Sequence, residues 1–374
     1  MTDKRRFYSL DVVRGLAIMI MLFVDAPPAA VAYPIFIHAP WEGLTFADFA
    51  FPGFVFAMGM SAAVSMARHE PSLRKIFRRA TLLFVAGVLF NELPAVFRYI
   101  FLPDFTAANF FDEAIVHMRP FGILQRLALT YALGMMIARA VRNDVGVAGA
   151  AFGLLFASSV GFHVFAPENP FDINHNLSGA IDMLIPGANH IYTPTHDPEG
   201  LYGTIGSTAS FLFGLMAGRI LVDHATTRDK IFLLTVSGVG LMIAGGLWSA
   251  FDIVAKNLWT APFALITSAV EIWLLAALMY LFENFPRTKK FFQPLASAGM
   301  NPLLIFLFVG TVFIALNIYP SSVEGTPVYI RFFQLSFARL VSPEFGSMIF
   351  CALWCLIWLP PSEFIRRRGI VIKI

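Results

Sequence analysis

The sequence predicts an all-α, polytopic membrane protein with about ten transmembrane helices, forming a single domain over residues 1–374. The first observation is composition, because 57% of the residues are hydrophobic and only 14% are charged, whereas a soluble domain is about a quarter charged. The second is the recurrence of long apolar runs, and the third is the distribution of Lys and Arg between them. The net charge of +3 is small, and no basic segment interleaved with aromatic residues predicts a nucleic-acid partner.

A helix that spans a bilayer needs roughly 20 mostly apolar residues. Such runs are predicted at about 9–33, 46–66, 80–102, 121–140, 146–166, 204–222, 230–251, 261–282, 294–316 and 344–362. The short segment 328–342 carries two arginines and is predicted to lie at the membrane interface. Cys351 and Cys355 fall in the last run and are expected to be buried small apolar residues, and no spacing of ligand residues predicts a metal site.

The positive-inside rule predicts the orientation. Lys and Arg concentrate around Lys4, Arg5 and Arg6, in the loops 68–79, 139–145, 223–230 and 283–291, and in the C-terminal tail. The opposite side holds only Arg98, Arg119, Lys256, Arg331 and Arg339. Both termini are therefore expected in the cytoplasm. His38, a long outer loop at 167–203 and the loop 251–260 are expected together on the outer side.

One stretch combines polar chemistry with the start of a membrane helix. Residues 36–59 open with His38, Trp41, Glu42 and Asp48 and continue as an apolar run. If Asp48 lies in the first turn of a helix, its carboxylate can reach back to the imidazole of His38. A histidine held by a carboxylate is a competent general base near neutral pH. The alternative is a loop histidine that only hydrogen-bonds a helix cap.

Seven sequence blocks carry a family resemblance over nearly the whole chain: SLDVVRG (9–15), HAPWEGLTFADFAFPGFVFAMG (38–59), GILQRLALTY (122–131), GAIDMLIPG with NHIY (179–192), DPEGLYGTIGS (197–207), KNLWT (256–260) and AGMNPLLIF (298–306). In these blocks and their order the chain resembles the transmembrane acyltransferases typified by heparan-α-glucosaminide N-acetyltransferase, especially the shorter bacterial members labelled NagX.

The resemblance implies an enzyme that moves an acetyl group from cytosolic acetyl-CoA, its co-substrate, to the amine of a glucosamine-type sugar outside the membrane. It implies a bacterial inner (cytoplasmic) membrane protein surrounded by lipid, a homodimer, and no metal. His38 matches the family's active-site histidine, as general base or acetyl carrier. Asp48 matches the aspartate that orients the imidazole.

The remaining site residues follow from the same matches. Arg14, Gln125, Arg126 and Asn301 are expected to bind acetyl-CoA, and Asp25, Trp41, Asp182, Glu199 and Asn257 are expected to bind the sugar. Asp25 departs from the family, which commonly has Asn there, so an anionic group can meet the sugar's ammonium. The basic loop 68–79 can hold CoA phosphates, although positive-inside topology explains most of its charge.

Several alternatives stay open from the sequence. The amine can attack the thioester directly with His38 as base, or His38 can first become acetylated. Arg126, Asn257 or a backbone amide can stabilise the oxyanion. The polar residues within membrane helices also suit an amino-sugar transporter, and the same His–Asp pair suits an O-acyltransferase that acts on a glycan.

Overall fold

A computed structural model of the chain describes residues 7–223, 225–321 and 325–370, so Lys4, Arg5, Arg6 and the end of the C-terminal tail lie outside it. The longer helices are α1 (Tyr8–Val24), α2 (Ala50–Met66), α3 (Leu73–Asn91), α6 (Ile123–Ala140), α7 (Asp144–Phe165), α9 (Gly203–Val222), α10 (Thr227–Trp248), α11 (Ala261–Asn284), α12 (Thr288–Met300), α13 (Pro302–Ile318) and α15 (Pro343–Ile357). Within the described ranges there are no strands beyond two isolated bridges, which confirms the all-α class.

Shorter helices and single turns connect the bundle at its ends. They are η1 (Pro28–Ala30), η2 (Pro34–Phe36), η3 (Phe46–Phe49), α4 (Leu93–Phe101), α5 (Ala107–Phe111), η4 (Asp112–Val116), α8 (Leu177–Leu184), η5 (Ala188–His190), α14 (Val328–Ser336) and α16 (Leu359–Arg367). The segment 167–203, expected as a long outer loop, therefore contains α8 and η5. Helix α14 accounts for the predicted interfacial segment.

Seven helical segments of the described chain are long and apolar enough to cross a membrane, or eight if the bent pair α12–α13 is one span. Two more of the predicted runs correspond to α1, which has 17 residues, and α6, which has 18 residues and carries polar side chains. Each predicted run therefore has a helix at its position. The number ten remains a prediction, because α1 and α6 are short or polar for a full span.

Three predicted boundaries were wrong. Helix α1 ends at Val24 rather than near residue 33. Pro27 and Pro28 follow, and a proline disfavours helical backbone at the residue before it. Helix α3 begins at Leu73, where the Ser72 side chain caps it, so 73–79 is helical rather than loop. The run 294–316 is not one straight helix, since α12 and α13 meet at a 67° bend.

Helix α9 is the buried centre of the bundle, and it packs against α2, α6, α7 and α11. Glycines allow its closest approach: a Cβ on Gly59 would meet the carbonyl of Phe211, and one on Gly214 would meet the carbonyl of Phe56. The cysteines of α15 are both buried and unbridged, as predicted.

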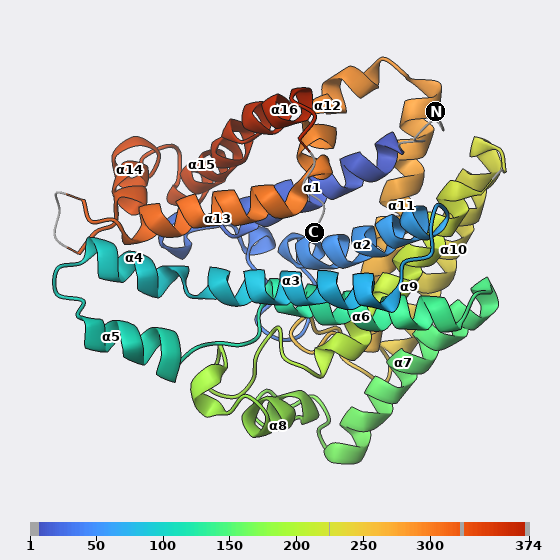
Figure 1. The fold of residues 1–374 in the computed structure, drawn as a ribbon, viewed down its shortest axis with the longest axis horizontal. Helices are drawn as coiled ribbons and strands as arrows, with labels where there is room; N and C mark the ends of the chain where they lie inside the picture. Colours follow the sequence, from blue (N-terminus) through green and yellow to red (C-terminus); the bar gives the residue numbers. More distant parts are fainter. Residues whose placement is uncertain (1–6, 224, 322–324, 371–374) are drawn as a thin grey trace.

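The loops separate into two sets at opposite ends of the bundle. At one end, Trp41 Nε1 donates to Phe171 O at 2.9 Å and Gly43 N donates to Val254 O at 2.8 Å. At the other, Arg139 donates to the carbonyl of Pro71 and Arg219 pairs with Asp144. Figure 1 shows α4, α5 and α14 at one end and the start of α1 near the other. This grouping matches the predicted sides, while the identity of the cytoplasmic face stays a prediction.

Candidate active site

Two neighbouring cavities lie between the helices. The outer cavity, of about 510 Å³, contains His38 and adjoins the outer loops. The inner cavity, of about 460 Å³, contains Arg14. Both are lined by Ile123 and Leu124 of α6 and by Phe306 of α13. These three apolar side chains therefore form a shared wall between the two cavities.

His38 and Asp48 form the hydrogen-bonded pair that the sequence predicted. His38 Nδ1 lies 2.9 Å from Asp48 Oδ1, and the Asp48 side chain is fully buried whereas that of His38 is 38% exposed. Asp48 Oδ2 accepts from Ala39 N at 3.2 Å and from Thr45 N at 2.9 Å. This capping box at the start of η3 fixes the carboxylate. The Nε2 atom of His38 is left as the ring nitrogen available to the outer cavity.

Two further charged groups line the outer cavity beside this pair. Lys256 Nζ lies 3.9 Å from Asp48 Oδ1, and its side chain is only 15% exposed. Asp25 follows the end of α1 and lines the same cavity, with an exposed side chain. Desolvation raises the pKa of Asp25, while His38 and Lys256 act in the opposite direction. Burial lowers the pKa of Lys256, and Glu199, Asp48 and Asp25 oppose that change.

An ion-pair network forms one wall of the outer cavity. Arg119 donates to Asp197 Oδ2 at 2.7 Å and Oδ1 at 2.5 Å, and to Glu199 Oε2 at 2.5 Å. Despite its burial, these two carboxylates raise the pKa of Arg119. Glu199 thus lines the cavity, as expected for a sugar contact, but one of its oxygens is committed to Arg119. Asn257 also lines this cavity, with Nδ2 3.5 Å from Pro40 O.

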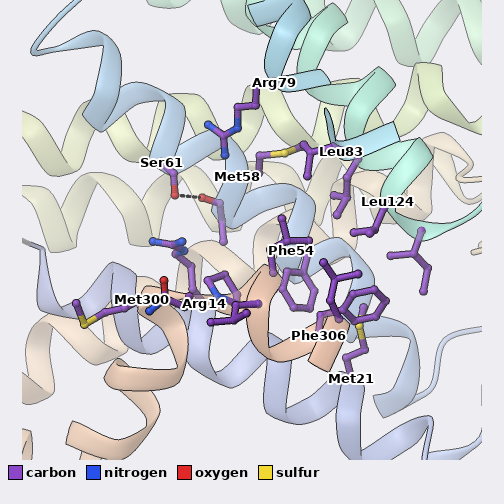
Figure 2. Close-up of a pocket in the computed structure, with 18 residues that line it drawn as sticks. Arg14, Met21, Phe54, Met58, Ser61, Arg79, Leu83, Leu124, Met300 and Phe306 are labelled. Atoms are coloured by element: carbon purple, nitrogen blue, oxygen red, sulfur yellow. Dashed lines mark hydrogen bonds between the residues drawn. The ribbon is translucent and has the colours of Figure 1, made fainter. Parts of the chain in front are cut away.

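The inner cavity is mostly apolar with a few polar side chains at one side. Figure 2 shows Arg14, Arg79 and Ser61 away from Leu124, Phe306 and Met21. Arg79 lies over the Tyr131 ring at 4.6 Å, and Asn301 Nδ2 donates to Ile370 O at 2.9 Å. Arg14 and Asn301 therefore line the same cavity. Arg79 joins them from the predicted basic segment.

Gln125 lines the outer cavity immediately beyond the shared wall. Its side chain is fully buried, and within the described ranges neither Oε1 nor Nε2 has a hydrogen-bond partner. A buried, unpaired amide costs free energy of about 1–3 kcal/mol.

The family model described as heparan-alpha-glucosaminide N-acetyltransferase, catalytic, matches residues 6–235. The chain belongs to this family. The human heparan-alpha-glucosaminide N-acetyltransferase is 27% identical over 365 residues, covering 81% of this chain and 52% of the human protein. The mouse protein of the same name is 26% identical over 369 residues, covering 82% and 53%.

The chain thus spans about half the length of these two N-acetyltransferases. The family match includes His38, Asp48, Gln125 and Glu199, whereas Lys256 lies beyond its end. Residues from inside and from beyond the matched range nonetheless line the same outer cavity. The cavity is therefore assembled from the matched part of this N-acetyltransferase-family chain and from the helices that follow it.

Three residues expected at the ligands lie outside both cavities. Arg126 is buried, donates to Gly200 O at 2.8 Å and lies over the Trp259 ring. Asp182 accepts from Asp197 N at 3.0 Å and Leu201 N at 3.2 Å. Trp41 holds the outer loop through Phe171. Direct ligand contacts by Arg126, Asp182 and Trp41 find no support in this arrangement, because their side chains are occupied in packing the outer loop.

Lys256, Arg119 and Phe306 line the outer cavity but were not among the predicted site residues. Arg119 and Lys256 were visible in the sequence as two of few basic residues on the outer side. Because these two basic residues lie on a side that is otherwise mostly acidic, they could have been included among the candidate site residues. Phe306 ends a family block, yet nothing in the sequence distinguished it from the many other phenylalanines of the chain.

Proposed function

We propose that this protein is a membrane acetyltransferase that moves an acetyl group from acetyl-CoA to the amine of a glucosamine-type sugar. The observation that carries the proposal is the His38–Asp48 pair, which opens onto a cavity that shares a wall with a second, basic-ended cavity. A donor and an acceptor can enter from opposite ends and meet at His38. Membership in the N-acetyltransferase family supports the same reaction.

In this proposal the inner cavity receives the acetyl-CoA from the cytoplasmic face. Arg14 and Arg79 bind its phosphates, since guanidinium groups bind phosphate with paired hydrogen bonds. The pantetheine arm passes the wall formed by Ile123, Leu124 and Phe306. Gln125 pairs with an amide of that arm, and the thioester then lies within the outer cavity.

The amino sugar binds in the outer cavity. Asp25 faces the sugar's ammonium, and Glu199 and Asn257 offer acceptor and donor groups to its hydroxyls. The ammonium first loses one proton to water on the outer side, which frees the nitrogen lone pair. His38 Nε2 then takes a second proton from the nitrogen as it attacks the thioester carbon. Asp48 fixes the proton on Nδ1 and stabilises the imidazolium. We favour this direct transfer over an acetyl-histidine intermediate, because the two cavities adjoin at the histidine.

The test is transfer of labelled acetyl from acetyl-CoA to glucosamine by the purified protein. His38→Ala should abolish transfer. The matched control is His163→Ala, because His163 Nε2 also pairs with a buried aspartate, Asp252, at 3.0 Å, but lines neither cavity. The control should keep transfer near the wild-type rate.

Three other results would redirect the proposal. Label on a sugar hydroxyl rather than on the amine would identify an O-acyltransferase. Sugar uptake into vesicles without any dependence on acetyl-CoA would identify a transporter. Equal losses in both histidine variants would remove the special role of His38.

A further inference from the structure

Lys256 is held in a rigid turn between α10 and α11. Trp259 N donates to Lys256 O at 3.0 Å, and Thr260 Oγ1 donates to Ile253 O at 2.7 Å while accepting from Ala255 N at 3.1 Å. Trp259 is fully buried and has a φ of +50°, a left-handed backbone that is uncommon for a large side chain. These contacts fix the backbone of the turn that carries Lys256.

The ammonium of Lys256 lies beside the catalytic pair and keeps its donors free. Asp48 Oδ1, at 3.9 Å, is beyond hydrogen-bond distance, and within the described ranges the ammonium makes no hydrogen bond. Its other charged neighbours are Asp25, Glu199 and Arg126, which come from the end of α1, the outer loop and α6. Since the side chain lines the outer cavity, its three N–H donors are available to a ligand there.

The reaction proposed above needs such a donor. When the amine attacks, the C–N bond forms and the carbonyl π electrons move to oxygen, while His38 takes a proton from nitrogen. The intermediate collapses as the C–S bond breaks, and the CoA thiolate takes the proton from His38. The negative charge on the carbonyl oxygen must be stabilised between these two steps, which is the main electrostatic demand of acyl transfer.

The other cations near the site are already committed. Arg126 lies outside the cavity and donates to Gly200 O. Arg119 lines the cavity, but it makes three hydrogen bonds to Asp197 and Glu199. Lys256 is thus the cavity-lining cation, among the described residues, that has no hydrogen-bond acceptor of its own.

We propose that the ammonium of Lys256 donates a hydrogen bond to the thioester carbonyl and stabilises the oxyanion of the tetrahedral intermediate. This assignment rests on the acetyl transfer of the proposed function. It makes Lys256 a catalytic residue that complements His38: the histidine handles the proton and the lysine handles the charge on oxygen. Burial supports this role, because a desolvated ammonium interacts more strongly with an oxyanion than a hydrated one.

The experiment compares Lys256→Met, Lys256→Cys and the surface control Lys290→Met in acetyl transfer to glucosamine. Wild-type transfer first establishes the proposed function, so its failure is seen separately. Loss of one oxyanion donor lowers kcat by about 10²- to 10³-fold. We expect that loss in Lys256→Met and Lys256→Cys, with KM for acetyl-CoA within about threefold, and no loss in Lys290→Met.

Chemical rescue separates catalysis from structural charge balance. Aminoethylation of the Lys256→Cys thiol with 2-bromoethylamine restores an ammonium on a side chain of nearly lysine length. The two native cysteines are buried, which favours reaction at the cavity. We expect aminoethylation to raise kcat at least tenfold and iodoacetamide, which adds a neutral group, to leave it low. A kcat near wild type in Lys256→Met, or equal activity after both reagents, would overturn the assignment.

Discussion

Replacing Asp48 by asparagine should leave the fold intact and disable His38 as a base. Asp48 Oδ2 accepts from Ala39 N, Thr45 N and Thr45 Oγ1, at 3.2, 2.9 and 3.1 Å. In Asp48→Asn the amide oxygen must take this position, because an NH₂ group there would face three donors. The amide NH₂ is then directed at His38 Nδ1, which lies 2.9 Å away in the wild type.

That geometry reverses the tautomer of the histidine. An amide N–H can donate only to an unprotonated Nδ1, so the proton of the neutral ring moves to Nε2. Nε2 is the atom that must accept the amine's proton, and it can no longer do so. Because positioned general bases contribute about 10²- to 10⁴-fold, we expect kcat to fall by that factor, or by about 3–5.5 kcal/mol of transition-state stabilisation.

The assay is steady-state acetyl transfer to glucosamine, with thermal unfolding in detergent measured in parallel. Asp252→Asn is the matched control, because Asp252 is equally buried and pairs with His163 outside the cavities. We expect full activity in the control. A folded Asp48→Asn protein with kcat within about threefold of wild type would refute the reasoning on the tautomer.

Three further predictions concern stability and specificity. Arg119→Ala should lower the free energy of unfolding by about 3–5 kcal/mol, because it leaves buried carboxylates unpaired. Arg98→Ala, which removes a half-exposed ion pair with Glu113, should change that free energy by less than about 1 kcal/mol. Thermal unfolding measures both variants, and equal shifts would contradict the stabilising role of the Arg119 ion pairs. Burial raises the pKa of Asp182 to about 6 from 3.8. The folded protein therefore binds the proton of this carboxyl more tightly than the unfolded chain does. The free energy of unfolding should accordingly fall as pH rises from 4 to 6. Asp182→Asn should flatten that slope in unfolding measured across this range, and an unchanged slope would contradict the assignment. Phe306→Ala should enlarge the space between the two cavities and raise the preference for propionyl-CoA over acetyl-CoA about tenfold, since one methylene in a pocket is worth about 1–3 kcal/mol. Phe308→Ala, on the exposed face of α13, should leave the ratio of kcat/KM for the two donors unchanged.

The features that the sequence predicted best are local ones. His38 and Asp48 are close in sequence, and a helix cap brings them together without help from distant segments. Hydrophobic run length similarly predicted the position of every long helix. The bend between α12 and α13 was missed, although Asn301 and Pro302 are a recognisable break signal.

The features that were missed depend on direction and on distant contacts. Gln125 and Arg126 were expected to act together, but neighbouring residues on a helix point about 100° apart. Gln125 therefore faces the cavity, whereas Arg126 points toward Gly200 and Trp259. Lys256 approaches Asp48 from a turn far along the chain, where Trp259 has a left-handed backbone. No motif or residue spacing in the sequence predicts this contact between Lys256 and Asp48.

The central claim is that donor and acceptor reach His38 from opposite faces of the membrane. Sealed vesicles of one orientation test it directly, with labelled acetyl-CoA supplied outside and glucosamine trapped inside. With the Arg14 face outward, we predict labelled N-acetylglucosamine in the lumen, and none when acetyl-CoA and glucosamine are exchanged between the compartments. Product that forms only when both substrates share one compartment would contradict the claim, because the two cavities would then not act as one path across the membrane.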